Sequence, residues 1–174
     1  PGLLVPPMTP FTAAGSVDYD AYEEQIEYIV RDCGATAVPL MAVEAQEYRC
    51  LDVDTRQDVI RRGVAAVDGR APVIVGASAD SVDLAIQVGE IASTVDAAAV
   101  QLLIPRRPQG GDQSVAEITA FFERVSDALG LPTVAYHNPG VGASLSPDQL
   151  VALARSDSVI AFKESTRNLR HVMN

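Results

Sequence analysis

Lysine is almost absent from this chain of 174 residues, because twelve of its thirteen basic residues are arginine and only Lys163 is lysine. Arginine stays protonated in proteins, whereas a desolvated lysine can lose its proton and act as a nucleophile. Lys163 is therefore a candidate for covalent chemistry. A general preference for arginine in the sequence would give the same count.

Cysteine and long apolar segments are also scarce. Cys33 and Cys50 have neither metal-ligand spacing nor the number needed for a disulfide framework, so we expect both to be buried structural residues. No apolar run approaches the roughly 18 residues of a membrane span, and the start of the chain lacks the charged region of a signal peptide. These absences predict a soluble, cytoplasmic protein with no membrane partner.

Positive charge is in deficit, since the formal net charge is -10 and no basic run is present. Such a chain would repel a phosphate backbone, which excludes nucleic acid as an expected partner. A hydrophobic content of 48% is enough for one globular domain with a substantial core.

Short apolar runs alternate with longer amphipathic stretches, which is typical of repeated βα units around a parallel sheet. Helix-start signals support this division at Asp54, at Ser114 and at Ser146-Pro147. The expected strands cover residues 3–5, 37–41, 72–75, 98–104, 133–137 and 159–162. The expected helices cover residues 19–32, 54–67, 81–93, 114–129 and 147–155, and a sixth begins near Asn168.

Six βα repeats with no linker predict a single α/β domain over residues 1–174. A complete (β/α)₈ TIM barrel needs roughly 250 residues, so the chain would contain the first six units and lack the last two. A doubly wound open sheet is the alternative for six parallel strands. The first βα turn lacks the G-x-G-x-x-G pattern that would favour a dinucleotide site in such a sheet.

Two expected strands end in residues suited to carbonyl chemistry. Tyr136 and Lys163 are one βα repeat apart, and reactive groups of parallel barrels project from the carboxyl ends of the strands. A neutral lysine can condense with a ketone to give an electron-withdrawing iminium, and a nearby tyrosine could transfer the protons. Burial at the barrel mouth would favour the neutral amine. A strand-end aromatic and a surface lysine are the plainer interpretations.

The chain resembles the dihydrodipicolinate synthase and N-acetylneuraminate lyase family. The likeness rests on Thr9-Pro10-Phe11 with residues 15–19, on residues 73–77, on Tyr136-His137-Asn138-Pro139 and on Lys163-Glu164-Ser165. It implies that Lys163 forms a Schiff base with pyruvate or another 2-oxo acid and that Tyr136 transfers protons. It also implies a homotetramer, and chemistry without a metal or other cofactor.

Residues 42–47 depart from the family, which has a Gly-Thr-Thr-Gly-Glu loop that grips the carboxylate of pyruvate. Glu47 matches the closing glutamate, whereas Glu44 and Ala45 stand where the two threonines would be. An anionic Glu44 would repel a substrate carboxylate, so we do not expect pyruvate to bind in the usual manner. If it faces the pocket, Glu44 could act as an acid or base or orient a hydroxyl. The alternative is that it points away.

Arg106 and Arg107 stand where the family often has Pro-Tyr-Tyr, whose second tyrosine completes a relay across a subunit interface. The two arginines could instead bind a carboxylate, or they could be a solvated loop or interface pair. The synthase branch also has an arginine soon after the Asn-Pro equivalent, and residues 140–143 supply none. The sequence therefore argues against dihydrodipicolinate synthase itself.

Two histidines remain. His137 alternates away from Tyr136 and is expected to pack behind the site, and His171 is expected to be exposed near the chain end. The leading hypothesis is a class I lyase or aldolase that makes or breaks a carbon-carbon bond between a 2-oxo acid and an aldehyde or sugar acid. The alternatives are a sugar-acid dehydratase of the same family and a non-catalytic binding protein on the same scaffold.

Overall fold

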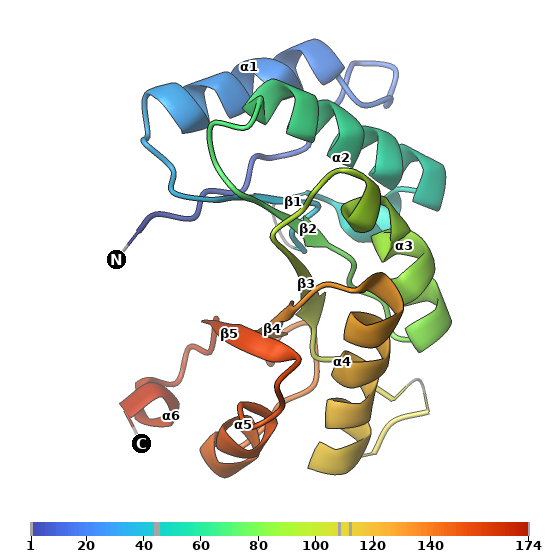
Figure 1. Cartoon of the computed structure of the whole chain (residues 1–174), viewed down its shortest axis with the longest axis vertical. Helices are drawn as coiled ribbons and strands as arrows, with labels where there is room; N and C mark the ends of the chain where they lie inside the picture. Colours follow the sequence, from blue (N-terminus) through green and yellow to red (C-terminus); the bar gives the residue numbers. More distant parts are fainter. Residues whose placement is uncertain (1, 44–45, 108, 112, 174) are drawn as a thin grey trace.

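The computed structural model describes residues 2–43, 46–107, 109–111 and 113–173, and it forms one parallel sheet with helices along its outer face (Figure 1). The strands are hydrogen-bonded to one another in chain order, and every neighbouring pair is parallel. They are β1 (Val38–Leu40), β2 (Val73–Gly76), β3 (Ala99–Leu103), β4 (Thr133–His137) and β5 (Val159–Glu164).

The helices connect successive strands and pack against one another in sequence, α1 on α2, α2 on α3, α3 on α4 and α4 on α5. A doubly wound sheet would need a reversal of strand order, and the order here runs in one direction. The prediction of a partial (β/α) barrel is therefore confirmed. The helices are α1 (Tyr19–Arg31), α2 (Val53–Val67), α3 (Val82–Thr94), α4 (Val115–Leu129), α5 (Pro147–Leu153) and α6 (Leu169–Met173), with a short 3₁₀ helix η1 (Tyr48–Cys50).

The first expected strand, residues 3–5, is reduced to a single parallel bridge between Leu4 and Ala37. The amide of Thr36 donates to the carbonyl of Leu3 at 2.8 Å beside this bridge. Two prolines follow at positions 6 and 7, and proline has no N–H with which to continue a ladder. Of the six expected strands, the one over residues 3–5 is therefore present only as this bridge.

Helix starts follow the local chemistry read from the sequence. Ser114 forms the predicted capping box with Glu117. The helix predicted to start at Ser146-Pro147 does so, with proline in its first turn and a capping box between Ser146 and Gln149 in addition. The start of α2 differs, because Asp52 is the cap and accepts the amide of Thr55 at 2.7 Å, whereas Asp54 lies within the first turn. A carboxylate at either place complements the positive end of the helix.

Side chains alternate between the two faces of the sheet, as they must along any strand. The outward set, which includes Leu40, Val75, Val100 and Leu102, is fully buried under the helices. The inward set lines an apolar hollow of about 450 Å³ that contains Ile74, Val134, Ala161 and Lys163 among others. The only lysine thus lies on the inner face of the sheet.

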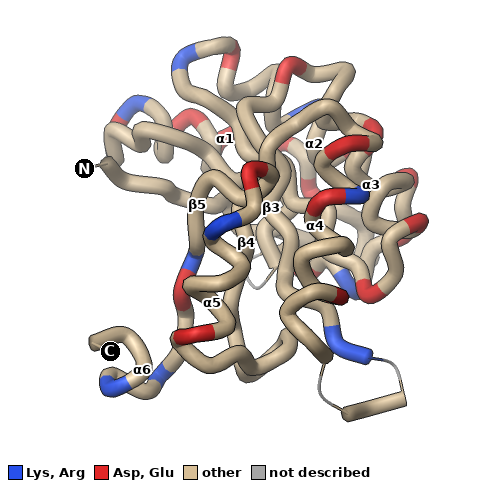
Figure 2. Tube along the Cα trace, turned by 60° about the horizontal axis from the view of Figure 1, so that its bottom comes forward, with Lys and Arg blue, Asp and Glu red and all other residues tan. Residues whose placement is uncertain are grey.

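The structure can be compared with the expectations for the two cysteines and for membrane-spanning segments. Cys33 is half-buried and Cys50 is exposed, so the expectation that both cysteines are buried is wrong. The charged residues lie mainly on helices and connecting loops (Figure 2). None of the helices in the described part of the chain is both long and apolar enough to span a membrane.

Gly76 closes β2 where the chain after β1 passes very near. A Cβ on Gly76 would lie 2.0 Å from the carbonyl oxygen of Met41, which is backbone and cannot rotate away. A Cβ on Gly89 in α3 would meet the end of the Leu129 side chain at 2.6 Å and the Cβ of Ala77 at 3.2 Å, but no backbone atom at such short range. Position 76 therefore requires glycine because the backbone of Met41 lies too close for a side chain. At position 89 a side chain would meet only other side chains at such short range.

We predict that Gly76→Ala lowers the free energy of unfolding by about 1–3 kcal/mol or more, as overpacking against fixed atoms does. Gly89→Ala should cost less, because Leu129 can change rotamer and alanine favours a helix. Urea denaturation of both variants measures the difference. Equal losses in the two variants would contradict the role given to the Met41 carbonyl.

Candidate active site

The register between β4 and β5 brings the two predicted catalytic residues together. Tyr136 is the partner of Lys163, and His137 is the partner of Glu164. A one-residue shift near the start of the pair sets this register, because Thr133 pairs with Val159 and the next residue of β4 pairs with Ala161. Tyr136 and Lys163 consequently share the inner face, and His137 and Glu164 share the outer face.

On the inner face, Lys163 lies over the ring of Tyr136. Its Nζ is 4.0 Å from the ring centroid, and Tyr136 itself is fully buried while Lys163 is half-buried. A ring face attracts an ammonium, so this contact suits the charged lysine, whereas partial burial favours the neutral amine. The pair supplies an amine next to a proton-carrying hydroxyl, which are the two groups needed for iminium chemistry.

Asn138 completes the inner end of β4. Its Nδ2 donates to the Tyr136 hydroxyl oxygen at 2.9 Å, and its Oδ1 accepts the amide of Gly140 at 3.0 Å. Sequence reasoning used Asn138 only as part of the family motif at the end of this strand and gave it no role of its own. The strand alternation was the available signal, since residues 136 and 138 point to the same face.

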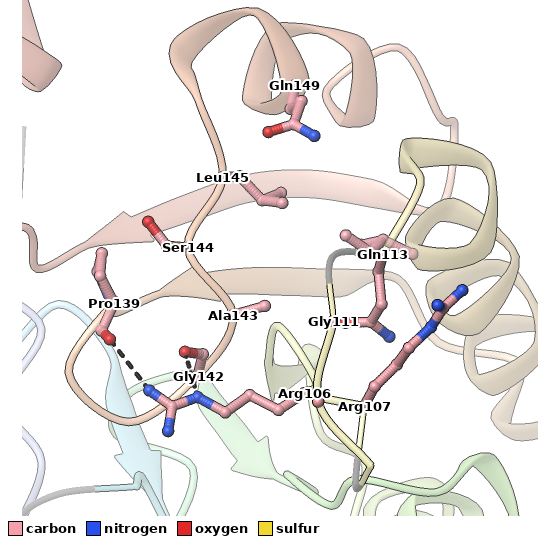
Figure 3. A pocket seen from close by; sticks show the side chains of 12 residues that line it. Arg106, Arg107, Gly111, Gln113, Pro139, Gly142, Ala143, Ser144, Leu145 and Gln149 are labelled. Atoms are coloured by element: carbon pink, nitrogen blue, oxygen red, sulfur yellow. Dashed lines mark hydrogen bonds between the residues drawn. The ribbon is translucent and has the colours of Figure 1, made fainter.

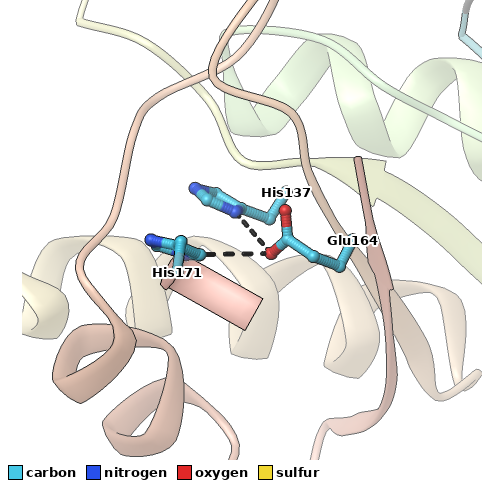
Figure 4. A group of neighbouring side chains, drawn as sticks. All are labelled: His137, Glu164 and His171. Carbon is cyan, nitrogen blue, oxygen red and sulfur yellow. Dashed lines mark hydrogen bonds and ion pairs between the residues drawn. The ribbon is translucent and has the colours of Figure 1, made fainter. Parts of the chain in front are cut away.

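On the outer face, His137 is fully buried, and its ring lies beside Glu164 and His171 (Figure 4). The amide of Leu145 donates to Nε2 at 3.1 Å, so Nδ1 must carry the proton of the neutral ring. Nδ1 donates to Glu164 Oε2 at 2.6 Å, and Glu164 Oε1 accepts the amide of Thr166 at 2.6 Å. His137 therefore ties together β4, β5 and the loop that follows β4, which agrees with its predicted place behind the site.

His171 corrects the expectation of an exposed residue. Its side chain is only 14% exposed and its ring stacks on His137 with centroids 5.1 Å apart. The ligand atoms of His137, Glu164 and His171 lie within 4.8 Å of one another, a spacing that a metal ion could bridge. A metal on Nδ1 of His137 would move the proton to Nε2, where it would face the donating amide of Leu145. The hydrogen bonds therefore fit this cluster better than a metal does.

The loop after β1 contains three of the predicted substrate-binding residues. Glu44 and Ala45 lie outside the described residues, and Glu47 is exposed with a left-handed backbone, φ 48°, at the start of η1. The loop is anchored by Gln46, which sequence reasoning missed. Gln46 is fully buried and its Oε1 accepts the amide of Ala42 at 2.5 Å.

Two further contacts hold Gln46. Its Nε2 donates to the hydroxyl of Tyr22 at 3.3 Å, and its carbonyl accepts the hydroxyl of Thr9 at 3.1 Å. Burial raises the pKa of Tyr22 above its ordinary value, with the hydrogen bond from Gln46 acting in the opposite direction, so this tyrosine stays neutral. A buried amide with these partners fixes Gln46 against Thr9, Tyr22 and Ala42.

Arg106 reaches across to the loop after β4 (Figure 3). Its Nε donates to the carbonyl of Gly142 at 2.7 Å and its Nη2 to the carbonyl of Pro139 at 3.1 Å. Arg106 and Arg107 both border a hollow of about 450 Å³ that also includes Gln113 and Gln149. The structure thus puts Arg106 beside the residues that follow Tyr136, while it is partly engaged by backbone carbonyls.

Arg107 forms an ion pair with Glu117, the residue that completes the capping box of α4. Hydrogen bonds from Ser114, followed by the one from Arg107, lower the pKa of Glu117 to about 2. A substrate carboxylate would have to compete with Glu117 for Arg107. The two arginines are neighbours in sequence but contact different partners.

The sequence profile of the Dihydrodipicolinate synthetase family matches residues 1–174. The chain is 29% identical over 170 residues to a 4-hydroxy-tetrahydrodipicolinate synthase of Pseudomonas savastanoi pv. phaseolicola, covering 97% of this chain and 56% of that enzyme. It therefore spans little more than half the length of this curated relative.

Solved structures give the same picture. Dihydrodipicolinate synthase from Aquifex aeolicus superposes with a TM-score of 0.85 at 26% identity, over 98% of this chain and 57% of that one. N-acetylneuraminate lyase from Mycoplasma synoviae superposes with a TM-score of 0.81 at 20% identity, over 98% and 57%. The second likeness, at this identity, concerns the fold alone.

We predict that His137→Phe lowers the free energy of unfolding by about 1–3 kcal/mol, because it leaves the buried amide of Leu145 without its acceptor and Glu164 without its donor. The matched control is His171→Phe, since Nε2 of His171 has no hydrogen-bond partner among the described residues. That control should stay within about 0.5 kcal/mol. Guanidinium denaturation compares them, and a control as costly as His137→Phe would show that ring stacking is what matters.

A second prediction concerns pH. The ordinary pKa of Glu117 is 4.5 and the folded value is about 2, so its carboxylate stabilises the fold fully above pH 4.5 and loses this contribution as the pH falls toward 2. Glu117→Gln should therefore flatten the decline in stability over that range. Glu123→Gln on the same helix is a control for removing one exposed carboxylate. Unfolding curves recorded between those pH values measure the slope, and an unchanged slope would contradict the assignment.

Proposed function

This chain belongs to the dihydrodipicolinate synthetase family, and from that premise we propose that it forms a Schiff base between Lys163 and a 2-oxo acid such as pyruvate. The observation that carries the proposal is the pairing of Tyr136 with Lys163, whose Nζ is 4.0 Å from the ring centroid. In the proposed reaction the iminium makes or breaks a carbon-carbon bond, as in a class I lyase or aldolase.

The neutral amine of Lys163 adds to the C2 carbonyl, and loss of water then gives the iminium. The iminium withdraws electrons from C3, so a proton or a carbon fragment can leave that atom with its bonding electrons retained by the enamine. Tyr136 gives a proton to, or takes one from, the substrate oxygen that changes charge. The iminium is the electron sink in these steps, so the proposed chemistry requires no metal or other cofactor.

We assign substrate recognition to the loops at the same edge of the sheet. Arg106 and Arg107 are the proposed anion-binding residues, and their hollow also has the amide side chains of Gln113 and Gln149. Neither Lys163 nor Tyr136 lines that hollow, so an anion bound there would belong to the far end of a larger substrate. Such a substrate would be a sugar acid or a related polyhydroxylated 2-oxo acid that has a second acidic group at its far end.

We also assign substrate binding to Glu44, Ala45 and Glu47, which follow β1 in the sequence. Glu47 is exposed in the loop after β1, and Glu44 and Ala45 remain candidates there without a described geometry. We propose a reaction other than that of dihydrodipicolinate synthase, because residues 140–143 contribute no arginine beside the site. Elimination of water from the same iminium, as in a sugar-acid dehydratase, is separated from aldol cleavage by the products, since only cleavage yields two carbon fragments.

We also propose that residues 1–174 are one barrel domain completed by two further βα units and assembled as a homotetramer. The homotetramer is proposed from the family likeness alone. The support for the completed barrel is the inner face of the sheet, where Leu4 and Ile160 are 52% and 60% exposed beside the apolar hollow. Exposed apolar residues on one continuous face indicate a surface that is normally covered.

The test is mass spectrometry after borohydride reduction in the presence of pyruvate and then of larger 2-oxo acids. One adduct is expected on Lys163, and because no other lysine occurs in the sequence its location is direct apart from the terminal amine. Tyr136→Phe should retain the adduct but slow turnover by about 10²–10⁴-fold, the usual contribution of a proton-transfer group.

Lys163→Arg is the matched control, because it keeps the charge and cannot form the imine. A folded protein that gives no adduct with any 2-oxo acid, or an adduct that persists in this control, would overturn the assignment. The first outcome would favour a binding protein on the same scaffold.

A further inference from the structure

Asn138 has a single allowed orientation. Only a donor is available from the backbone of Gly140, so the atom that faces this amide at 3.0 Å must be the oxygen Oδ1. The amide nitrogen Nδ2 then faces the hydroxyl oxygen of Tyr136 at 2.9 Å. The residue is 8% exposed, which protects both hydrogen bonds from exchange with water.

The phenol oxygen of Tyr136 is thus an acceptor toward Asn138, and its own proton points away from Asn138. Tyr136 is fully buried, and burial by itself disfavours a phenolate. A fixed N–H donor stabilises the charged oxygen more strongly than the neutral one. Asn138 therefore supplies, at the correct atom, the stabilisation that burial removes.

We propose that Asn138 is a positioning residue that holds the phenol oxygen of Tyr136 and stabilises its anion while the proton is on the substrate. When Tyr136 gives its proton to a substrate oxygen, negative charge develops on Oη, and Nδ2 is already in place to receive it. When the proton returns, the hydrogen bond reverts to its neutral form. This inference rests on the proposed Schiff-base function.

The neighbouring side chains are engaged elsewhere. His137 points to the opposite face, where its nitrogens contact Leu145 and Glu164. Lys163 faces the Tyr136 ring from β5, with its Nζ 4.0 Å from the ring centroid.

Two substitutions separate the two contacts of Asn138, which are the hydrogen bond that Nδ2 donates to Tyr136 and the one that Oδ1 accepts from Gly140. Asn138→Asp keeps an oxygen for the Gly140 amide but replaces the donor with a negative charge, whereas Asn138→Ala removes both contacts. Asn168→Asp is the charge control, because Asn168 lies in the loop before α6 and its Oδ1 likewise accepts a backbone amide, that of Arg170. All variants are made in the full protein and checked for cooperative unfolding.

The first measurement is the ultraviolet absorbance of phenolate against pH, with Tyr136→Phe subtracted to isolate this tyrosine from the other four. The midpoint for Tyr136 is expected to rise by roughly one pH unit in Asn138→Ala and by more in Asn138→Asp. Asn168→Asp should leave it unchanged. A midpoint that stays at the wild-type value in Asn138→Asp would overturn the proposal, even if Asn138→Ala does not fold.

The second measurement separates this inference from the proposed function. Borohydride trapping of pyruvate on Lys163 should continue in Asn138→Asp, while exchange of the pyruvate methyl protons in D₂O should become at least about tenfold slower. Trapping with unchanged exchange would refute the role of Asn138 and leave the Schiff base standing. Failure of trapping in the wild-type protein would instead refute the proposed function, and the absorbance titration would still decide whether Asn138 controls Tyr136.

Discussion

The one-residue shift between β4 and β5 is the constraint on which the site depends. Thr133 pairs with Val159, and Val134 pairs with Ala161, so Ile160 has no partner of its own. Without this shift Tyr136 would face Phe162, and Lys163 would be paired with His137. Because side chains alternate with a period of two, a slip of one residue moves a whole set to the other face. The irregularity therefore places the amine beside the phenol.

The same register also gives each face its own kind of stabilisation. On the outer face, the His137–Glu164 hydrogen bond is closed off by α6 and by the loop before α5. On the inner face, Tyr136 and Asn138 form a second hydrogen-bonded pair, and Lys163 lies over the Tyr136 ring. Three consecutive residues at the end of β4 thus serve different purposes. His137 anchors the strand on the outer face, whereas Tyr136 and Asn138 lie on the inner face.

Much of this arrangement could be predicted from the sequence, because it depends on local patterns. The apolar runs predicted strands β1 to β5, Ser114 with Glu117 predicted the start of α4, and Pro147 predicted the start of α5. The pairing of Tyr136 with Lys163 followed from repeat length and family likeness. The burial of Gln46 and the stacking of His171 could not be read in this way. Each depends on contacts between distant segments, and a polar residue in a loop carries no local sign of them.

The inner and outer faces differ in completeness, and this difference has a chemical consequence. The outer face is covered by helices, whereas the inner hollow exposes apolar side chains, and the Nε2 of the buried Gln101 has no hydrogen-bond partner among the described residues. An iminium is stable only where water is kept from it, and a lysine is neutral only where its charge is poorly solvated. For the proposed Schiff-base chemistry, Lys163 and Tyr136 alone are therefore insufficient, because the same sheet must also be enclosed on its inner side. The register of β4 and β5 determines that Lys163 meets Tyr136. In the proposed mechanism, enclosure of the inner face determines whether the Lys163 amine is neutral and able to react.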